Sequence, residues 1–122
     1  MKPLALLVYE KLLPASQLVN QLQDRGYRVQ SLTNPAELVE HAEREKPLIV
    51  IADLEGRFNM CEGISKLRQN PGTGHVPVIA FATPDNTTVQ DQARAAGAKL
   101  VVNDNAILVH LEQFLAQALD VE

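Results

Sequence analysis

Lys46-Pro47-Leu48-Ile49-Val50-Ile51-Ala52-Asp53 is the stretch that decides the fold. Its apolar run from Leu48 to Ala52 follows a proline and ends at an aspartate. Such an uninterrupted run is typical of a parallel strand that is buried on both faces. Because Asp53 comes directly after it, polar chemistry begins at the carboxyl end of the strand, which is where open parallel sheets form their ligand sites.

Apolar segments on both sides of this stretch extend the same pattern. They predict further strands at 4–8, 27–32, 76–81 and 100–102. Apolar residues at helical spacing predict helices between these strands, with Asn34 as one N-cap, and a final helix over 107–119 with the strongest pattern. Five strands that alternate with five helices predict right-handed crossovers and a doubly wound α/β sheet, formed by one domain over residues 1–122.

Composition narrows the class of protein. The chain has 122 residues, of which 46% are hydrophobic, and this suits a single core. A net charge of -4 and a 4% share of aromatic residues favour neither direct nucleic-acid binding nor an anionic membrane surface. The apolar runs are far shorter than the roughly 20 residues that cross a bilayer, and no signal segment is evident, so we expect a soluble cytoplasmic protein.

The residues that follow the expected strands form the candidate site, because the carboxyl ends of parallel strands meet at one edge. Asp53 and Glu10 would influence each other's ionisation, as carboxylates of functional sites do. A strand-end aspartate that caps a loop and a solvated glutamate in the first turn of a helix are the alternatives. The other candidates at this edge are Tyr9, Glu55, Ala82, Thr83, Asn103 and Asp104.

Thr83, the loop after Asp53 and Cys61 each have a functional and a simpler interpretation. Thr83 could supply a hydroxyl to the site, although a loop threonine that bonds its own backbone is the simpler expectation. Arg57 and Phe58, in the loop after Asp53, would make a contact patch if exposed, and otherwise they pack within the loop. Cys61 has no partner cysteine and is expected to be a small packed residue.

The order of these features resembles the receiver domain of two-component response regulators. The resemblance rests on Asp53 after the third strand, on Pro77-Val78-Ile79 at the fourth and on Ala96-Gly97-Ala98 before the fifth. It implies a flavodoxin-like (CheY-like) five-stranded sheet with strand order 2-1-3-4-5. It also implies that Asp53 matches the aspartate that takes a phosphoryl group from a histidine kinase.

The resemblance implies a magnesium site that is only partly kept. The family places two adjacent acids after the first strand, and here Tyr9 and Glu10 match them, so one acid remains. Glu10, Asp53 and the backbone carbonyl expected near Glu55 are the implied ligands of a weakly bound Mg²⁺.

Other matching positions depart from the family's pattern. Ala82 stands where the family has a Ser or Thr that bonds the phosphoryl group, and Thr83 is one residue late. Asn103 or Asp104 stands where the family has a lysine. Phosphoryl transfer depends on positioning and on neutralising the transferred oxygens, so these departures predict inefficient phosphorylation.

The leading hypothesis is a receiver-like signalling module, not an enzyme, that acts through protein contacts with weak or absent phosphorylation control. The resemblance implies a histidine kinase or another signalling protein as partner, and a docking or homodimer face formed by the last strand and helix. The alternative is a working phosphoacceptor that is phosphorylated on Asp53 in a Mg²⁺-dependent reaction. A cofactor-binding enzyme is disfavoured because the loop after the first strand lacks the Gly, Ser and Thr cluster that wraps a flavin phosphate.

Overall fold

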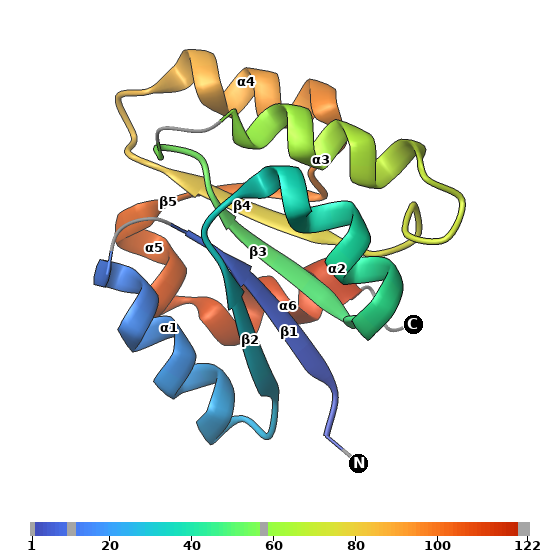
Figure 1. Cartoon of the computed structure of the whole chain (residues 1–122). Coiled ribbons are helices and arrows are strands. Elements are labelled where there is room, and N and C mark those ends of the chain that lie inside the picture. Colours follow the sequence, from blue (N-terminus) through green and yellow to red (C-terminus); the bar gives the residue numbers. More distant parts are fainter. Residues whose placement is uncertain (1, 10–11, 57–58, 120–122) are drawn as a thin grey trace.

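Five parallel strands form one sheet in the order β2-β1-β3-β4-β5 (Figure 1). The computed structural model describes residues 2–9, 12–56 and 59–119. The strands are β1 (Leu4–Val8), β2 (Arg28–Leu32), β3 (Ile49–Asp53), β4 (Val78–Ala82) and β5 (Leu100–Asn103). This arrangement confirms the predicted doubly wound, flavodoxin-like sheet and its strand order.

Helices cover both faces of the sheet (Figure 1). The elements are α1 (Leu12–Asp24), η1 (Pro35–Glu37), α2 (Leu38–Glu45), α3 (Met60–Gln69), α4 (Thr87–Ala96), α5 (Asp104–Val109) and α6 (Leu111–Leu119). Alternate residues of β1 point to opposite faces: Leu6 packs with the α2, α3 and α4 side chains, and Leu7 with those of α1, α5 and α6. Asn34 is an N-cap, as predicted, but it caps η1 and not α2: its side chain accepts a hydrogen bond from the Ala36 amide at 2.9 Å, whereas the N-cap of α2 is Glu37.

The expectation of one final helix over 107–119 is wrong. The segment is two helices, and the backbone at His110 leaves the helical region with φ -115° and ψ 25°. Ile107 and Leu111 are both fully buried on either side of this break. The apolar spacing therefore continues through His110, because periodicity reports the buried face and not whether the helix axis is continuous.

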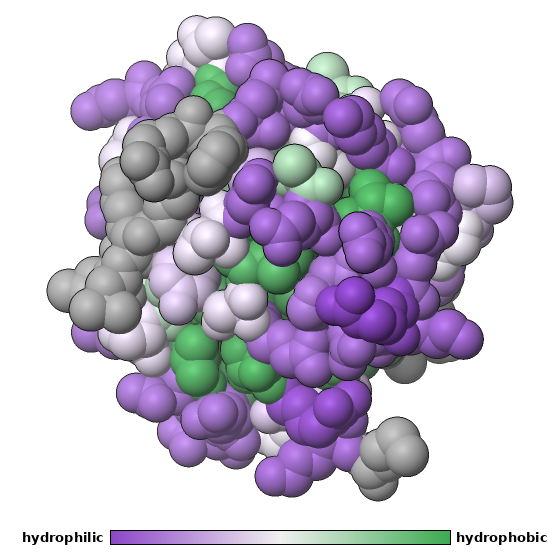
Figure 2. Space-filling model, in the orientation of Figure 1, coloured by the Kyte–Doolittle hydropathy of each residue, from purple (hydrophilic) through white to green (hydrophobic). Residues whose placement is uncertain are grey.

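Leu48 also departs from the expected buried run. The strand begins one residue later, at Ile49, and 43% of Leu48 is exposed at the amino edge of the sheet. On the face shown in Figure 2, hydrophilic side chains predominate and hydrophobic ones appear only in small separate areas. Within residues 2–9, 12–56 and 59–119, no helix is both long and apolar enough to cross a membrane.

Candidate functional site

Asp53 ends β3 and is almost completely buried, with 4% of its surface exposed. Its Oδ1 accepts a hydrogen bond from the Glu55 amide at 3.0 Å. This local bond closes the turn that follows the strand, as short polar side chains do in turns. Asp53 therefore fixes the direction in which the chain leaves the sheet and places Glu55 beside the next loop.

The Glu55 side chain joins the loop after β3 to the loop after β4. Its Oε1 accepts a hydrogen bond from the Thr83 amide at 2.9 Å, and its Oε2 accepts one from the Thr83 hydroxyl at 2.9 Å. The Asn86 side-chain amide donates to Oε2 at 3.2 Å. We call this arrangement of Glu55, Thr83 and Asn86 the loop bridge. A carboxylate that accepts several N–H and O–H donors makes stronger bonds than a neutral acceptor does.

The loop bridge contains contacts of two residues that the sequence does not predict. The simpler expectation for Thr83, a hydroxyl bonded to its own backbone, is wrong, because that hydroxyl donates to a side chain 28 residues away. For Glu55 the expected contribution of a backbone carbonyl stays a prediction, and the structure adds contacts of the carboxylate that the sequence did not predict.

Asn86 is a site residue that the sequence reasoning missed. Its side-chain oxygen accepts a hydrogen bond from the Val89 amide at 3.3 Å and so caps α4, while its amide group donates to Glu55. Gln90 strengthens the same corner by donating to the Thr83 carbonyl at 2.8 Å. The N-cap pattern of Asn86 before Thr87 is a sequence signal that could have identified the residue.

Ala82 and Asn103 lie side by side at the carboxyl edge, because they are paired residues of β4 and β5. Ala82 is fully buried, and Asn103 is exposed. Asp104 follows as the first residue of α5. The structure thus places Ala82, at the position where the resemblance implies a hydroxyl, beside Asn103, which is one of the two residues that match the lysine; Asp104 is the other.

Of the magnesium ligands implied by the resemblance, the structure describes Asp53 and Glu55, so the site as a whole stays a prediction. Among the described residues, no group of three or more His, Cys, Asp or Glu side chains could hold a metal ion. Asp53 supplies one carboxylate, and the carboxylate of Glu55, whose backbone carbonyl is the implied ligand, is bonded to Thr83 and Asn86. Glu10, Arg57 and Phe58 lie outside the described residues.

Comparison with known proteins gives a match at the level of structure only. No protein-family model matches the chain, and no curated protein does. The receiver domain of a sensor histidine kinase from Pseudomonas aeruginosa, solved with magnesium in its active-site cleft, is 18% identical. It superposes with a TM-score of 0.87 over 99% of this chain and 100% of that one.

Two further solved structures show the same likeness. A chemotaxis response regulator of Vibrio cholerae is 18% identical, with a TM-score of 0.76 over 93% of this chain and 98% of that one. The receiver domain of a response regulator from Saccharomyces cerevisiae, crystallised with a histidine phosphotransfer protein, is 14% identical. Its TM-score is 0.81, over 96% of this chain and 88% of that one. The chain therefore has the CheY-like fold of receiver domains, as the resemblance implies.

Proposed function

We propose that this chain is a receiver-like signalling module, not an enzyme, that acts in the cytoplasm through protein contacts with weak or absent control by phosphorylation. The loop bridge is the observation that carries the proposal. A phosphoryl group on Asp53 would need donors from the loop after β4 in order to move that loop. The amide and the hydroxyl of Thr83 already donate to the Glu55 carboxylate.

The Glu55 carboxylate reduces the free energy by which a phosphoryl group on Asp53 could shift the loop after β4. A ligand shifts a conformational equilibrium only by the difference in its interactions with the two states. If the Thr83 donors exchange one anionic acceptor for another, the net gain is small, because the lost bonds to Glu55 offset the new ones. The loop after β4 is therefore held in one arrangement whether or not Asp53 is modified.

The neighbouring positions support the same proposal. A lysine at the end of β5 would add a charge-assisted bond to phosphoryl oxygens, commonly about 1.5–3 kcal/mol, and Asn103 carries no charge. Asp104, the next residue, adds negative charge at this edge. Ala82 offers no hydroxyl. The alternative function, a phosphoacceptor in which Glu10 and Asp53 hold Mg²⁺, lacks this cation and this hydroxyl and has the negative charge of Asp104 nearby.

We propose a histidine kinase, a phosphotransfer protein or another signalling protein as the partner, since one structural neighbour was crystallised with a phosphotransfer protein. The face formed by β5 and the last helices is the proposed docking or homodimer surface. Along β5, three residues are half-buried and Asn103 is exposed. Val109, at the end of α5, is 73% exposed and is one of two large hydrophobic residues exposed in the described part of the chain.

Chemical phosphorylation tests the proposal. The wild-type chain and the triple variant Tyr9→Asp/Ala82→Ser/Asn103→Lys are incubated with Mg²⁺ and phosphoramidate, and intact mass reports the gain of one phosphoryl group. The triple variant restores an acid, a hydroxyl and a cation at the positions that the resemblance assigns. We expect the triple variant to be modified and the wild type to be modified far less under the same conditions.

Controls make the result interpretable. Adding Asp53→Asn to the triple variant should abolish its modification, and circular dichroism should show that every variant is folded. Rapid modification of wild-type Asp53, with a change at Thr83, would contradict the proposal and favour the phosphoacceptor alternative.

A further inference from the structure

A groove of about 880 Å³ lies at the amino edge of the sheet, opposite the edge that carries Asp53. The segments that lead into β1, β3, β4 and β5 line it, together with the end of α6. Pro3, Pro47 and Pro77 come just before three of these strands and give the groove rigid apolar walls. Leu48, which is 43% exposed, adds an apolar side chain to the lining.

Positive charge is concentrated in this groove. The chain as a whole has a net charge of -4, with 11 Lys and Arg against 15 Asp and Glu. Among the residues that the structure describes, five of these 11 cations line the groove, with one histidine and a single carboxylate, Glu45. Glu45 accepts hydrogen bonds from Gln30 and Arg44, neither of which lines the groove. The cationic residues of the lining are Lys2, Arg28, Lys46, Arg68 and Lys99, beside His75.

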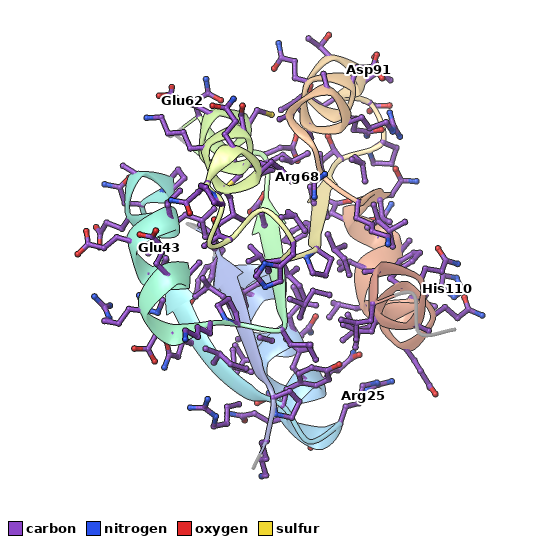
Figure 3. The ribbon with its side chains drawn as sticks, turned by 90° about the vertical axis from the view of Figure 1, so that its right-hand side faces the viewer. Arg25, Glu43, Glu62, Arg68, Asp91 and His110 are labelled. Carbon is purple, nitrogen blue, oxygen red and sulfur yellow. The ribbon has the colours of Figure 1, made fainter. Side chains whose placement is uncertain are left out.

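Two of these cations are oriented by a hydrogen bond to a backbone carbonyl and have further donors. Arg28 donates from Nε to the Lys2 carbonyl at 3.3 Å, and Arg68 donates from Nη1 to the Gly74 carbonyl at 2.8 Å. A guanidinium has five N–H donors, so one such bond orients it and leaves others for a ligand. Figure 3 shows Arg68 toward the middle of the molecule, between the ribbons of α3 and α4, with Asp91 and His110 at the periphery.

Gly97 provides the space in which Arg68 lies. A Cβ atom at Gly97 would come within 2.5 Å of Arg68 Cγ, so any larger residue would displace this side chain.

Lys46 places a charged side chain in the groove although its backbone conformation is strained. Its φ is 52°, the only positive φ of a non-glycine residue in the described part of the chain. Glycine is favoured in this left-handed conformation at the end of a helix, and other residues are less stable there. The backbone at the end of α2 would thus be more stable with glycine, whereas the groove would lose a cation.

We propose that the groove binds an acidic segment of a partner protein in which carboxylate and leucine-like side chains alternate. Arg and Lys at the rim match carboxylates, and the proline and leucine side chains match apolar residues between them. No Phe, Tyr or Trp occurs among the described residues that line the groove, so a nucleotide base would have no ring to stack on. The proposal does not depend on the state of Asp53.

Fluorescence anisotropy with a labelled peptide of alternating Glu and Leu tests this assignment on the full chain. We expect saturable binding that weakens as salt increases, because the attraction is electrostatic. The variant Arg28→Gln/Arg68→Gln should bind at least about tenfold more weakly. The charge-matched variant Lys66→Gln/Arg94→Gln removes cations that pair with Glu62 and Asp91 outside the groove, and its binding should change by less than about twofold.

Lys46→Gly separates binding from folding. This variant should raise the thermal midpoint of unfolding and still weaken peptide binding. A loss of binding caused by unfolding would instead come with a lower midpoint.

Three results would overturn the assignment. The first is equal loss of binding in the two double variants, and the second is equal binding of a peptide with Gln in place of every Glu. In the third, inorganic tripolyphosphate shifts the amide resonances of Leu48 and His75 while the peptide does not, so the groove would take phosphates instead.

Discussion

The Glu55 carboxylate accepts both the amide and the hydroxyl of Thr83, each at 2.9 Å, across 28 residues of sequence. This pair connects the loop after β3 to the loop after β4 at the carboxyl edge of the sheet. Asp53 also orients Glu55, because its Oδ1 accepts a hydrogen bond from the Glu55 amide at 3.0 Å. The loop after β4, which would have to respond to a modified Asp53, is therefore bonded to Glu55, two positions after Asp53.

A double-mutant cycle measures this connection. Glu55→Ala and Thr83→Val should each lower the free energy of unfolding by about 1 kcal/mol, since each removes charge-assisted bonds that are partly shielded from solvent. The double variant should lose less than the sum, with a coupling of at least about 0.5 kcal/mol. Urea unfolding gives these values.

Asp91→Ala is the matched control for the cycle. It removes an exposed pair with Arg94 at 3.0 Å and should change stability by less than about 0.5 kcal/mol. Strict additivity of Glu55→Ala and Thr83→Val would show that the two side chains do not bond in solution.

The pH dependence of stability should include a contribution from Glu45. The hydrogen bond from Gln30 is the main cause that lowers the pKa of Glu45 below its usual 4.5, and Arg44 adds to it. Because the pKa is lower in the folded state, this contribution is present above pH 4.5 and is lost as the pH falls through the folded pKa. Carboxyl NMR titration should give a midpoint below 4.5, and Gln30→Ala should move it upward.

Two glycine substitutions separate backbone strain from a steric clash. Gly26 and Gly97 both have positive φ, at 88° and 115°. A Cβ at Gly26 meets nothing within 4 Å, so Gly26→Ala should cost only about 1 kcal/mol for the backbone. Gly97→Ala also drives the new methyl group against Arg68 and should cost at least about 2 kcal/mol. Equal costs by thermal unfolding would show that Arg68 does not rest on Gly97.

Cys61 should react slowly with thiol reagents. Burial raises the pKa of its thiol above 9.0, so the reactive thiolate is scarce near neutral pH. The Sγ lies 3.9 Å from the Val89 carbonyl oxygen, between α3 and α4. Reaction with Ellman's reagent at pH 8 should be slower in the folded chain than in urea. Equal rates would contradict the packed position of this side chain.

The sheet could be predicted from the sequence because strand burial leaves a direct pattern of apolar residues. The continuous runs at β1, β3 and β4 and the glycine at the end of α4 are local signals, and the structure confirms them. The break at His110 left no such signal, since Ile107 and Leu111 keep helical spacing across it. Leu48 was misjudged because an apolar run does not show where the edge of the sheet begins.

The candidate site could be predicted in part. The position of Glu55 and Thr83 at one edge follows from parallel topology. Their bond could not be predicted, because it depends on the conformations of two loops and not on a period or a local motif. Asn86 was missed for the same reason, although its capping role is local.

Under the proposed function, the loop after β4 does not respond to an anion at Asp53. The most direct test follows the Thr83 amide in ¹H–¹⁵N NMR spectra while Mg²⁺ and then beryllofluoride, a phosphoryl mimic, are added, with Asp53→Asn as the control. We expect the Thr83 resonance to stay within the small shift seen in Asp53→Asn, because its donors remain on Glu55. A saturable shift of Thr83 that Asp53→Asn abolishes would contradict the claim and show that the site still switches.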